Sequence, residues 1–222
     1  MDGPARDGEG DRDGGRLDEG KGARTRRAIL DAAIVRFARD GFRATSMADI
    51  ARDAGLSSTG AYPYFANKEA LFFDAVDADS AALIAAATDV LTGLGERPDW
   101  RVAVAFGLIS EVEKHPLARR LLAGLEPEVT ERVLNIPALE LLRTQLSERI
   151  ALEQRAGRIR DDIDAGLVCG GAVVILLSLL MSVVQIGPAA IGMFQHEVEA
   201  FFDAAFAPIR DPGKAAAPLS NL

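Results

Sequence analysis

Residues that could carry catalytic or metal chemistry are few in this 222-residue chain. It contains two histidines, His115 and His196, and a single cysteine, Cys169. A zinc site needs several such ligands at short spacings, and a cysteine nucleophile needs a base beside it. These residues are far apart in sequence, and the carboxylates fall on polar positions of helix-like segments. We therefore expect no enzyme activity, no catalytic residue, no metal and no cofactor.

A segment of 27 residues, 45–71, has the pattern of two short helices joined by a glycine turn. Thr45 or Ser46 can cap the first helix, and Gly55 supplies the positive φ favoured just after a helix end. Ser57 can cap a second helix, predicted over about 58–65. The apolar positions of the first helix recur with a helical period, at Met47, Ile50, Ala51 and Ala54. The pattern is that of a helix-turn-helix, whose second helix enters the DNA major groove.

Residues 27–76 resemble the DNA-binding domain of the TetR family of regulators, without a gap. The resemblance rests on Arg27–Ala33, Phe37, Gly41, Thr45, Ile50–Ala51, Ala54–Ser57, Tyr62, Phe65, Lys68–Glu69 and Leu71. It implies an all-α homodimer with an N-terminal three-helix DNA-binding domain and a C-terminal helical domain for effector binding and dimerisation. It also implies a palindromic double-stranded DNA operator and a small-molecule effector.

The resemblance assigns DNA contacts to Thr45, Ser46, Ser57, Ser58, Thr59, Gly60, Tyr62, Tyr64 and Lys68. Thr45 and Ser46 lie at a helix N-terminus, where hydroxyls and free N–H groups can bind a phosphate; their alternative role is capping alone. Ser58 and Thr59 can bond base edges, although hydroxyls discriminate bases weakly. We therefore expect DNA shape to supply part of the specificity.

Tyr62, Tyr64 and Lys68 match family positions that reach the phosphate backbone or a base. In the alternative, one tyrosine belongs to the core and the lysine is simply solvated. Phe65 is expected in the core. Pro63 departs from the commoner family pattern because it removes a helical N–H and disfavours helical geometry at the preceding residue. We expect the second helix to end early or to be distorted there.

The charge distribution favours a nucleic-acid partner despite a net charge of −8. Residues 23–72 carry eight basic and five acidic side chains, whereas residues 1–22 carry four basic and seven acidic ones. The remaining residues are also acidic overall. A local positive segment is the electrostatic footprint expected of a DNA-binding element.

Composition predicts four regions in one all-α chain. Residues 1–22 have almost no large apolar side chain and are expected to be a disordered tail, either passive or reaching a minor groove through an arginine. The DNA-binding domain is expected over 23–72, the ligand-binding and dimerisation domain over 73–210, and a second tail over 211–222. The single cysteine and the lack of an apolar N-terminal stretch favour a cytoplasmic location.

Helical periodicity and breakers divide the chain into helices. We expect helices over about 25–40 (ended by Gly41), 68–94, 100–115 (capped by Asp99), 117–124, 127–156 (kinked or split at Pro137 and closed by Gly157), 165–186 and 191–206. In the first, Ile29, Leu30, Ala33, Ile34 and Phe37 should face inward.

Residues 165–186 are almost continuously apolar and long enough to span a membrane. Three features argue against a membrane span: the residues just before the segment are acidic, it has no basic flank of the kind that anchors membrane helices, and polar or small residues lie within it. A helix apolar on all sides is also expected where it packs on its own core and on a partner subunit. Following the resemblance, we expect a homodimer through the helices at about 162–186 and 191–206, and no membrane partner.

The sequence therefore predicts a dimeric TetR-type regulator, a repressor released from its operator by a small molecule. The alternative is a soluble dimeric adaptor or ligand sensor that does not read DNA sequence. The effector pocket should be an apolar cavity in the second domain. Candidates for its lining, by residue type alone, are Trp100, Phe106, Glu111, His115, Arg143 and Gln145.

Overall fold

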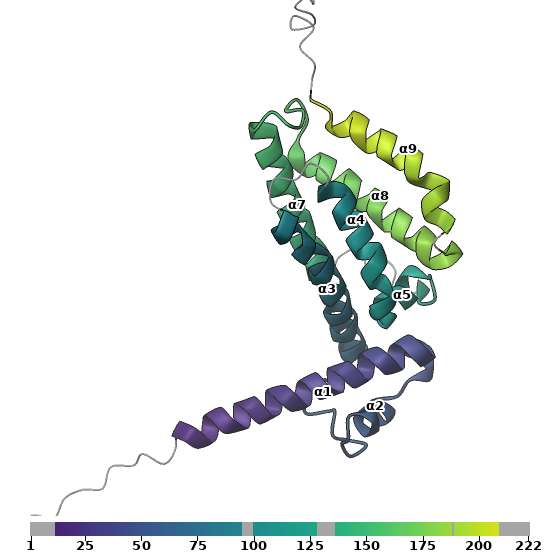
Figure 1. Cartoon of the computed structure of the whole chain (residues 1–222). Helices are drawn as coiled ribbons and strands as arrows, with labels where there is room; N and C mark the ends of the chain where they lie inside the picture. Colours follow the sequence, from purple (N-terminus) through teal and green to yellow (C-terminus); the bar gives the residue numbers. More distant parts are fainter. Residues whose placement is uncertain (1–11, 95–99, 128–135, 188, 209–222) are drawn as a thin grey trace, which may run out of the picture. The chain divides into compact units, whose positions relative to one another are not determined.

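Every regular element among residues 12–94, 100–127, 136–187 and 189–208, which the computed structural model describes, is helical (Figure 1). This confirms the all-α prediction. The chain forms two compact units, Met1–Asp79 and Ser80–Leu222. The boundary between the units falls inside helix α3 (Lys68–Leu94), whose bounds are those predicted.

The N-terminal unit contains α1 (Arg12–Ala44), α2 (Met47–Asp53) and the first turns of α3. Helix α1 begins well before the predicted start near Thr25, so the expectation of disorder is wrong for residues 12–22. Once a helix is nucleated, each added residue gains a hydrogen bond at little cost, and no proline lies between Pro4 and Pro63 to stop it. The rest of the predicted tail, 1–11, lies outside the described residues.

Gly41 breaks the regular part of α1, as predicted. Its φ of 82° and ψ of 169° are non-helical, and the chain resumes helical turns only as far as Ala44. A positive φ of this kind is readily adopted only by glycine. The break turns the chain toward α2, which packs against α1.

An aromatic cluster forms the core of the N-terminal unit. Phe72 of α3 is fully buried, with its ring centroid 5.0 Å from those of Phe37 and Phe42. Phe65 is also buried, as predicted, under the guanidinium of Arg26, which lies 4.8 Å from its ring centroid. Of the five inward positions predicted in α1, all are buried except Ile34, which is half-buried.

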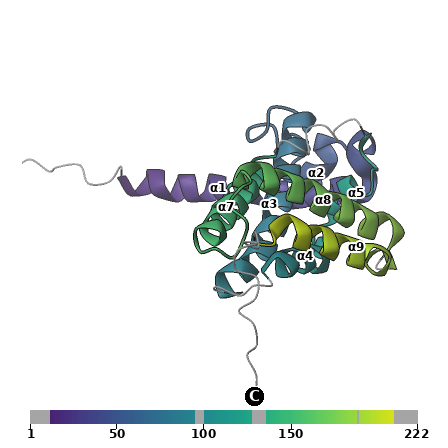
Figure 2. The same ribbon diagram turned by 90° about the horizontal axis from the view of Figure 1, so that it is seen from above.

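The C-terminal unit is a helical bundle around α8. Its helices after α3 are α4 (Trp100–Glu111), the 3₁₀ turn η1 (Val112–Lys114), α5 (Pro116–Leu122), α7 (Pro137–Arg155), α8 (Ala165–Ile186) and α9 (Ala189–Phe206). Helix α8 contacts α4, α5, α7 and α9, with α7 along one side and α9 along the other (Figures 1 and 2). These contacts account for the buried apolar residues of α8, namely Cys169, Val173, Leu180 and Val183.

Prolines and caps set the helix ends in this unit. Pro116 and Pro137 each occupy the first turn of a helix, where the missing N–H costs nothing. Pro137 therefore begins α7, so a helix boundary lies at the residue where a kink or a split was predicted; residues 128–135 lie outside the described part. Asp164 caps α8 by accepting a hydrogen bond from the Leu167 N–H at 2.9 Å. Gly157 ends α7 with a φ of 69°. The predicted Asp99 cap also lies outside the described residues.

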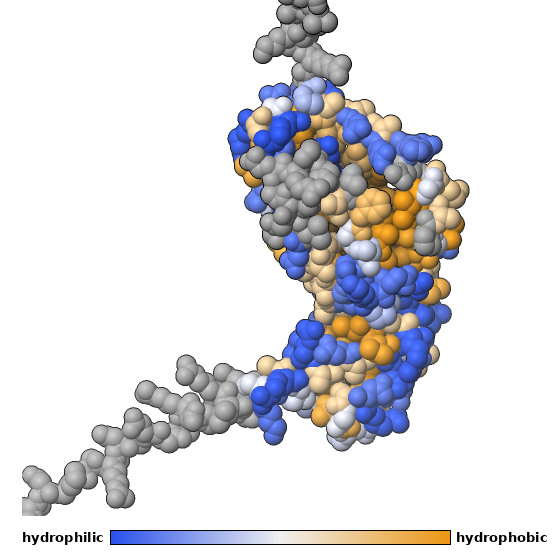
Figure 3. All heavy atoms as spheres, viewed as in Figure 1, coloured by the Kyte–Doolittle hydropathy of each residue, from blue (hydrophilic) through white to orange (hydrophobic). Residues whose placement is uncertain are grey.

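Helix α8 leaves a large apolar surface uncovered in the single chain. It is the described helix that is long and apolar enough to cross a membrane, and 22% of its most apolar window is buried. Leu167 is 80% exposed and Ile186 60% exposed. Figure 3 shows hydrophobic residues gathered on the C-terminal unit. An exposed apolar surface of this kind is characteristic of a binding surface.

The polar residues of α8 are satisfied by hydrogen bonds within the unit. The Ser178 and Ser182 hydroxyls donate to backbone carbonyls one turn earlier in the same helix, each at 2.9 Å. The Gln185 side-chain amide donates to the Leu122 carbonyl oxygen at 3.0 Å and so ties α8 to α5. Of these polar residues, Gln185 joins α8 to the rest of the bundle, whereas the two serines bond within their own helix.

A buried carboxylate at the end of α7 makes stability dependent on pH. Glu153 accepts hydrogen bonds from Nε of Arg149 at 3.0 Å and from Nε of Arg158 at 2.5 Å. The Arg158 hydrogen bond is the main cause that lowers the Glu153 pKa below its ordinary value of 4.5. The stabilisation is present above that ordinary pKa and is lost as pH falls through the lower pKa of the folded protein.

We expect Glu153→Gln to destabilise the chain by about 1–3 kcal/mol at pH 7, since two charge-assisted hydrogen bonds lose their charged acceptor. The difference between wild type and variant should shrink as the pH is lowered below about 4.5, because the wild-type carboxylate is then protonated as well. Urea unfolding from pH 3.5 to 7 measures this. An unchanged difference across that range would contradict the assignment.

Candidate nucleic-acid interface and ligand cavity

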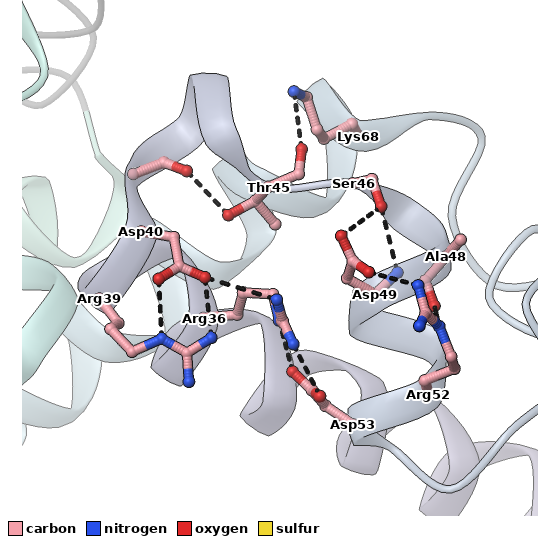
Figure 4. A network of polar contacts seen from close by, with 11 residues as sticks. Arg36, Arg39, Asp40, Thr45, Ser46, Ala48, Asp49, Arg52, Asp53 and Lys68 are labelled. Atoms are coloured by element: carbon pink, nitrogen blue, oxygen red, sulfur yellow. Dashed lines mark hydrogen bonds and ion pairs between the residues drawn. The ribbon is translucent and has the colours of Figure 1, made fainter.

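Ser46 is the N-cap of α2, at the start of the helix-turn-helix (Figure 4). Its hydroxyl oxygen accepts from the Asp49 N–H at 3.2 Å and donates to the Asp49 carboxylate at 2.7 Å. The same carboxylate accepts from Arg52 at 2.5 Å. These contacts lower the pKa of Asp49, mainly through the Ser46 hydrogen bond. The exposed Ser46 thus caps the helix and remains at the surface, where a phosphate can reach it.

Thr45 has a different position from the one predicted. Its side chain is buried, and its hydroxyl donates to the Gly41 carbonyl oxygen at 2.8 Å (Figure 4). The hydroxyl therefore stabilises the break in α1. The expectation that this hydroxyl contacts a phosphate is wrong, because the group is neither exposed nor free.

The turn after α2 has the geometry that the sequence predicted. Gly55 has a φ of 75°, and the Leu56 N–H donates to the Ala51 carbonyl at 2.8 Å. These features end the helix in the way a C-terminal glycine usually does. The chain is then directed into residues 57–66, here called the recognition segment.

The recognition segment is a series of tight turns. Three of its backbone hydrogen bonds run three residues back, from Gly60 to Ser57 at 2.8 Å, from Tyr62 to Thr59 at 3.2 Å and from Tyr64 to Ala61 at 3.1 Å, and one runs four residues back, from Phe65 to Ala61 at 3.1 Å. The predicted α-helix over 58–65 is therefore not formed. Pro63 is the physical reason, because it has no N–H to donate and its ring disfavours helical geometry before it.

The predicted contact residues of the recognition segment lie on its solvent side. Ser57, Ser58 and Thr59 are exposed, and Tyr62 is 55% exposed. Tyr64 is half-buried. On the opposite side, Ala61 and Phe65 are buried and anchor the segment to the domain. The arrangement can present hydroxyl groups to a polar partner from a fixed backbone.

Gly60 is required by a close approach within the recognition segment. A Cβ at this position would lie 2.8 Å from the Cβ of Leu56 and 3.1 Å from the Ser57 carbonyl oxygen. Neither of these atoms is the end of a flexible side chain. Gly60 therefore fixes the path of the segment.

Lys68 is a structural link that its sequence position did not reveal. Its ammonium donates to the carbonyl oxygen of Thr45 at 2.9 Å (Figure 4). It also donates to the Phe42 carbonyl oxygen at 2.9 Å and lies 4.4 Å from the centroid of the Phe42 ring. Two of its three N–H donors are thus used within the domain. It joins the start of α3 to the chain between α1 and α2. The acceptors are backbone groups, so no pattern of side chains could have indicated them.

We expect Lys68→Met to lower the free energy of unfolding by about 1.5–3 kcal/mol through loss of hydrogen bonds from a charged donor. If this link is the main role of Lys68, the slope of log affinity for DNA against log salt will stay unchanged. A phosphate contact would instead reduce that slope by about 1. Denaturant unfolding and DNA titrations at several salt concentrations separate the two roles.

Ion pairs hold α1 and α2 together on the side away from this link. The Arg36 guanidinium donates to both oxygens of Asp53, at 2.5 and 2.9 Å, and to Asp40 at 3.4 Å (Figure 4). Arg39 makes a two-pronged contact with the same Asp40. The Arg36 hydrogen bond is the first cause that lowers the pKa of Asp53. A bidentate contact fixes orientation as well as distance.

These contacts modify the electrostatic interpretation of residues 23–72. At least five of its eight basic side chains pair with carboxylates of the same unit, namely Arg26, Arg27, Arg36, Arg39 and Arg52. Much of the positive charge counted in the sequence is therefore balanced within the domain. The exposed hydroxyl and phenol groups consequently have a larger part in any DNA contact than the charge count suggested.

A cavity of about 300 Å³ lies in the C-terminal unit among α4, α7, α8 and α9. Trp100 and Phe106 line it, as predicted. The other candidates, Glu111, His115, Arg143 and Gln145, do not line it, which corrects those predictions. Glu111 pairs instead with Lys114 at 2.8 Å, and Arg143 with Glu140 at 3.0 Å.

The charged side chains in the cavity lining are Arg101, Glu199 and Asp203. Their role was not predicted, because residues about one hundred positions apart meet only through the packing of α4 against the end of α9. The Arg101 guanidinium lies 4.9 Å from the centroid of the Phe206 ring and 5.9 Å from that of Trp100. Burial lowers the pKa of Arg101, although the charges of Asp203 and Glu153 partly offset this.

Comparison with known proteins identifies the N-terminal segment. Residues 29–75 match the family of bacterial regulatory proteins called the tetR family. A Bacillus subtilis protein, the uncharacterized HTH-type transcriptional regulator YdgC, is 25% identical over 207 residues, covering 91% of this chain and 92% of that protein.

Solved structures share the fold along most of the chain. A putative TetR-family transcriptional regulator from Mesorhizobium loti has a TM-score of 0.67 at 24% identity, covering 84% of this chain and 98% of that one. A putative transcriptional regulator from Saccharomonospora viridis, solved in complex with choline, has a TM-score of 0.61 at 18% identity, covering 83% and 98%. Together, these findings show a tetR-family segment at residues 29–75, within a chain that has the all-α fold of the solved TetR-family regulators along most of its length.

Proposed function

We propose that this protein is a homodimeric repressor that binds a palindromic DNA operator and is released by a small-molecule effector. The observation that carries the proposal is the exposed row of hydroxyl-bearing residues in the recognition segment, within the part of the chain that matches the family. Ser57, Ser58, Thr59 and Tyr62 are proposed to contact bases or phosphates, and Ser46 a phosphate at the start of α2. The proposed location is the cytoplasm.

The uncovered surface of α8 supports the dimer. Val174 and Ile186 are more than half exposed, and on α9 so are Met193 and Phe201. These helices neighbour each other in the bundle, so their exposed apolar side chains can form one surface for a second copy. A two-fold dimer would present two recognition segments to a palindrome.

Helix α3 supports the proposed coupling between effector and DNA. It contributes to the core of the N-terminal unit through Phe72 and continues without a break into the C-terminal unit. A ligand that binds one conformation of the C-terminal unit better can shift the population of orientations of this helix. We expect an effector to weaken operator binding while light scattering still shows a dimer.

The first test is to mix the purified protein with sheared genomic DNA from its source at moderate salt and to sequence the retained fragments. Enrichment of a palindromic site is the expected result, and genes beside that site would suggest the effector. The absence of any enriched site, even at low salt, would overturn the proposal.

Two substitutions at one position refine this test. Tyr62→Ala should lose much of the affinity for the enriched site, and Tyr62→Phe should lose only the part due to the hydroxyl. Val35→Ala is a suitable control, because Val35 is exposed on α1 and lies outside the recognition segment. Equal affinity of all these variants would remove Tyr62 from the interface.

One observation favours a second candidate function, that of a soluble dimeric adaptor or sensor without sequence-specific DNA binding. The recognition segment lacks the α-helix that usually enters the major groove, because of Pro63. Pro63→Ala distinguishes the candidates. If the wild type selects no site and the variant does, the proline has disabled DNA reading.

A further inference from the structure

We infer that the cavity in the C-terminal unit binds an apolar molecule carrying one carboxylate, and that Arg101 pairs with this carboxylate. The inference deepens the proposed function, since it rests on this cavity being the effector site. It names the chemical class of the effector and the residue that selects it.

The body of the ligand is determined by the shape and chemistry of the cavity wall. Trp100, Phe106, Leu176, Phe202 and Phe206 are among the side chains that surround the space of about 300 Å³. The walls come from four helices, so a ligand would be enclosed on several sides. An apolar chain or ring system gains the transfer free energy of leaving water in such a site.

The head group is determined by Arg101. Its guanidinium is half-buried against the rings of Trp100 and Phe206. Among the described residues, no carboxylate or carbonyl accepts a hydrogen bond from it, and Asp203 acts on it only through charge at a distance. A guanidinium remains charged in a protein, so its planar N–H donors can bind an acceptor group that a ligand brings into the cavity. A carboxylate matches these donors in a two-pronged contact.

The greater burial of Arg101, compared with the two carboxylates at the cavity, favours an anionic ligand over a cationic one. Glu199 and Asp203 also lie at the cavity, but both are exposed and therefore well solvated. Water and salt screen their interaction with a ligand. Arg101 is partly removed from water, so its interaction with an opposite charge is stronger. It also already lies over the rings of Trp100 and Phe206, so these two rings are less available to a cationic ligand.

A matched set of probes tests the inference on the full-length protein. Decanoate, decanol and decylammonium share one apolar chain and differ only in the head group. Trp100 is the only tryptophan and lines the cavity, so its fluorescence reports directly on occupancy. We expect decanoate, below its micelle concentration, to bind at least about tenfold more tightly than decanol. Tighter binding of decylammonium than of decanoate, or no binding of any probe, would overturn the inference.

Substitutions of Arg101 and Asp203, the residues proposed to lie near the ligand carboxylate, test the same inference by changing the protein instead of the ligand. Arg101→Met keeps the apolar stem, and it should reduce decanoate affinity to that of decanol while leaving decanol unaffected. Asp203→Asn should strengthen decanoate binding, because it removes a repulsive charge without changing the lining otherwise. The Asp203 variant remains informative if the Arg101 variant fails to fold. Unchanged decanoate binding in Arg101→Met, or weaker binding in Asp203→Asn, would contradict the assignment.

The ligand class and the regulation of DNA binding can be tested separately. If decanoate binds through Arg101 but does not release the DNA site enriched from genomic fragments, the ligand class stands and the coupling fails. If no DNA site is enriched, the regulator proposal fails while the Trp100 titration still decides the ligand class. Release of the enriched site by decanoate, and its loss in Arg101→Met, is the result expected if both hold.

Discussion

Replacing Phe72 by alanine should destabilise the protein by about 3–5 kcal/mol, the largest effect we expect from a single substitution. Phe72 is fully buried, with the rings of Phe37 and Phe42 at 5.0 Å and that of Phe73 at 5.8 Å. Its removal leaves a cavity bounded by aromatic rings that cannot collapse around it. Chemical denaturation of the full chain, followed by circular dichroism, measures the loss.

Phe72→Leu is the matched control for this substitution. It keeps most of the apolar volume and loses mainly the ring contacts, so the loss should be about 1–2 kcal/mol. An equal loss of unfolding free energy in the two variants would show that the size of the cavity does not determine the destabilisation. DNA binding by the leucine variant should persist, because the recognition segment is untouched.

Gly60→Ala should reduce affinity for the enriched DNA site by about tenfold to a hundredfold. The added Cβ would lie 2.8 Å from the Leu56 Cβ, so the turns of the recognition segment must shift. Overpacking of this kind costs about 1–3 kcal/mol. Here the strain distorts the proposed contact surface, so the cost should be seen as weaker DNA binding. A quantitative gel-shift titration with the site from the genomic selection measures the change.

Gly20→Ala is the control for this glycine substitution. Gly20 lies on α1 with no atom within 4 Å of an added Cβ, and alanine favours a helix. This variant should bind DNA as the wild type does. A wild-type affinity in Gly60→Ala would show that the segment adjusts without penalty, or that it does not contact DNA.

The parts of the fold that the sequence predicted best are those with strong local signals. The bounds of α3 and α8 are as predicted, because their runs of apolar and helix-favouring residues end at glycines. The Ser46 cap and the Gly55 turn were also predicted, since each depends on one residue type at one backbone position. Pro63 likewise predicted the distortion of the recognition segment, although not its full conversion to turns.

The parts that the sequence could not predict depend on tertiary partners without a local pattern. Lys68 bonds to the backbone carbonyls of Phe42 and Thr45, which only the folded chain brings near it. Thr45 bonds locally to Gly41, but its burial depends on the fold. Arg101 acquires its role from Phe206, about one hundred residues away. The early start of α1 reflects helix propagation, which composition alone did not reveal. A residue type indicates what a side chain can do, whereas its burial and partners decide which of these roles it has.

The carboxylate partners of Arg26, Arg27, Arg36, Arg39 and Arg52 also determine how many counterions DNA binding can release. Each cation that neutralises a phosphate frees ions condensed on the duplex, and this release drives nonspecific binding. A guanidinium already balanced by its own domain adds little to that release. The net charge of residues 23–72, +3 from eight basic and five acidic side chains, is therefore a better guide to this release than the basic side chains alone, and Asp74, the partner of Arg26, reduces the net charge further. A protein with few ions to release spends less time on random DNA, so its search for an operator is less impeded by the rest of the chromosome.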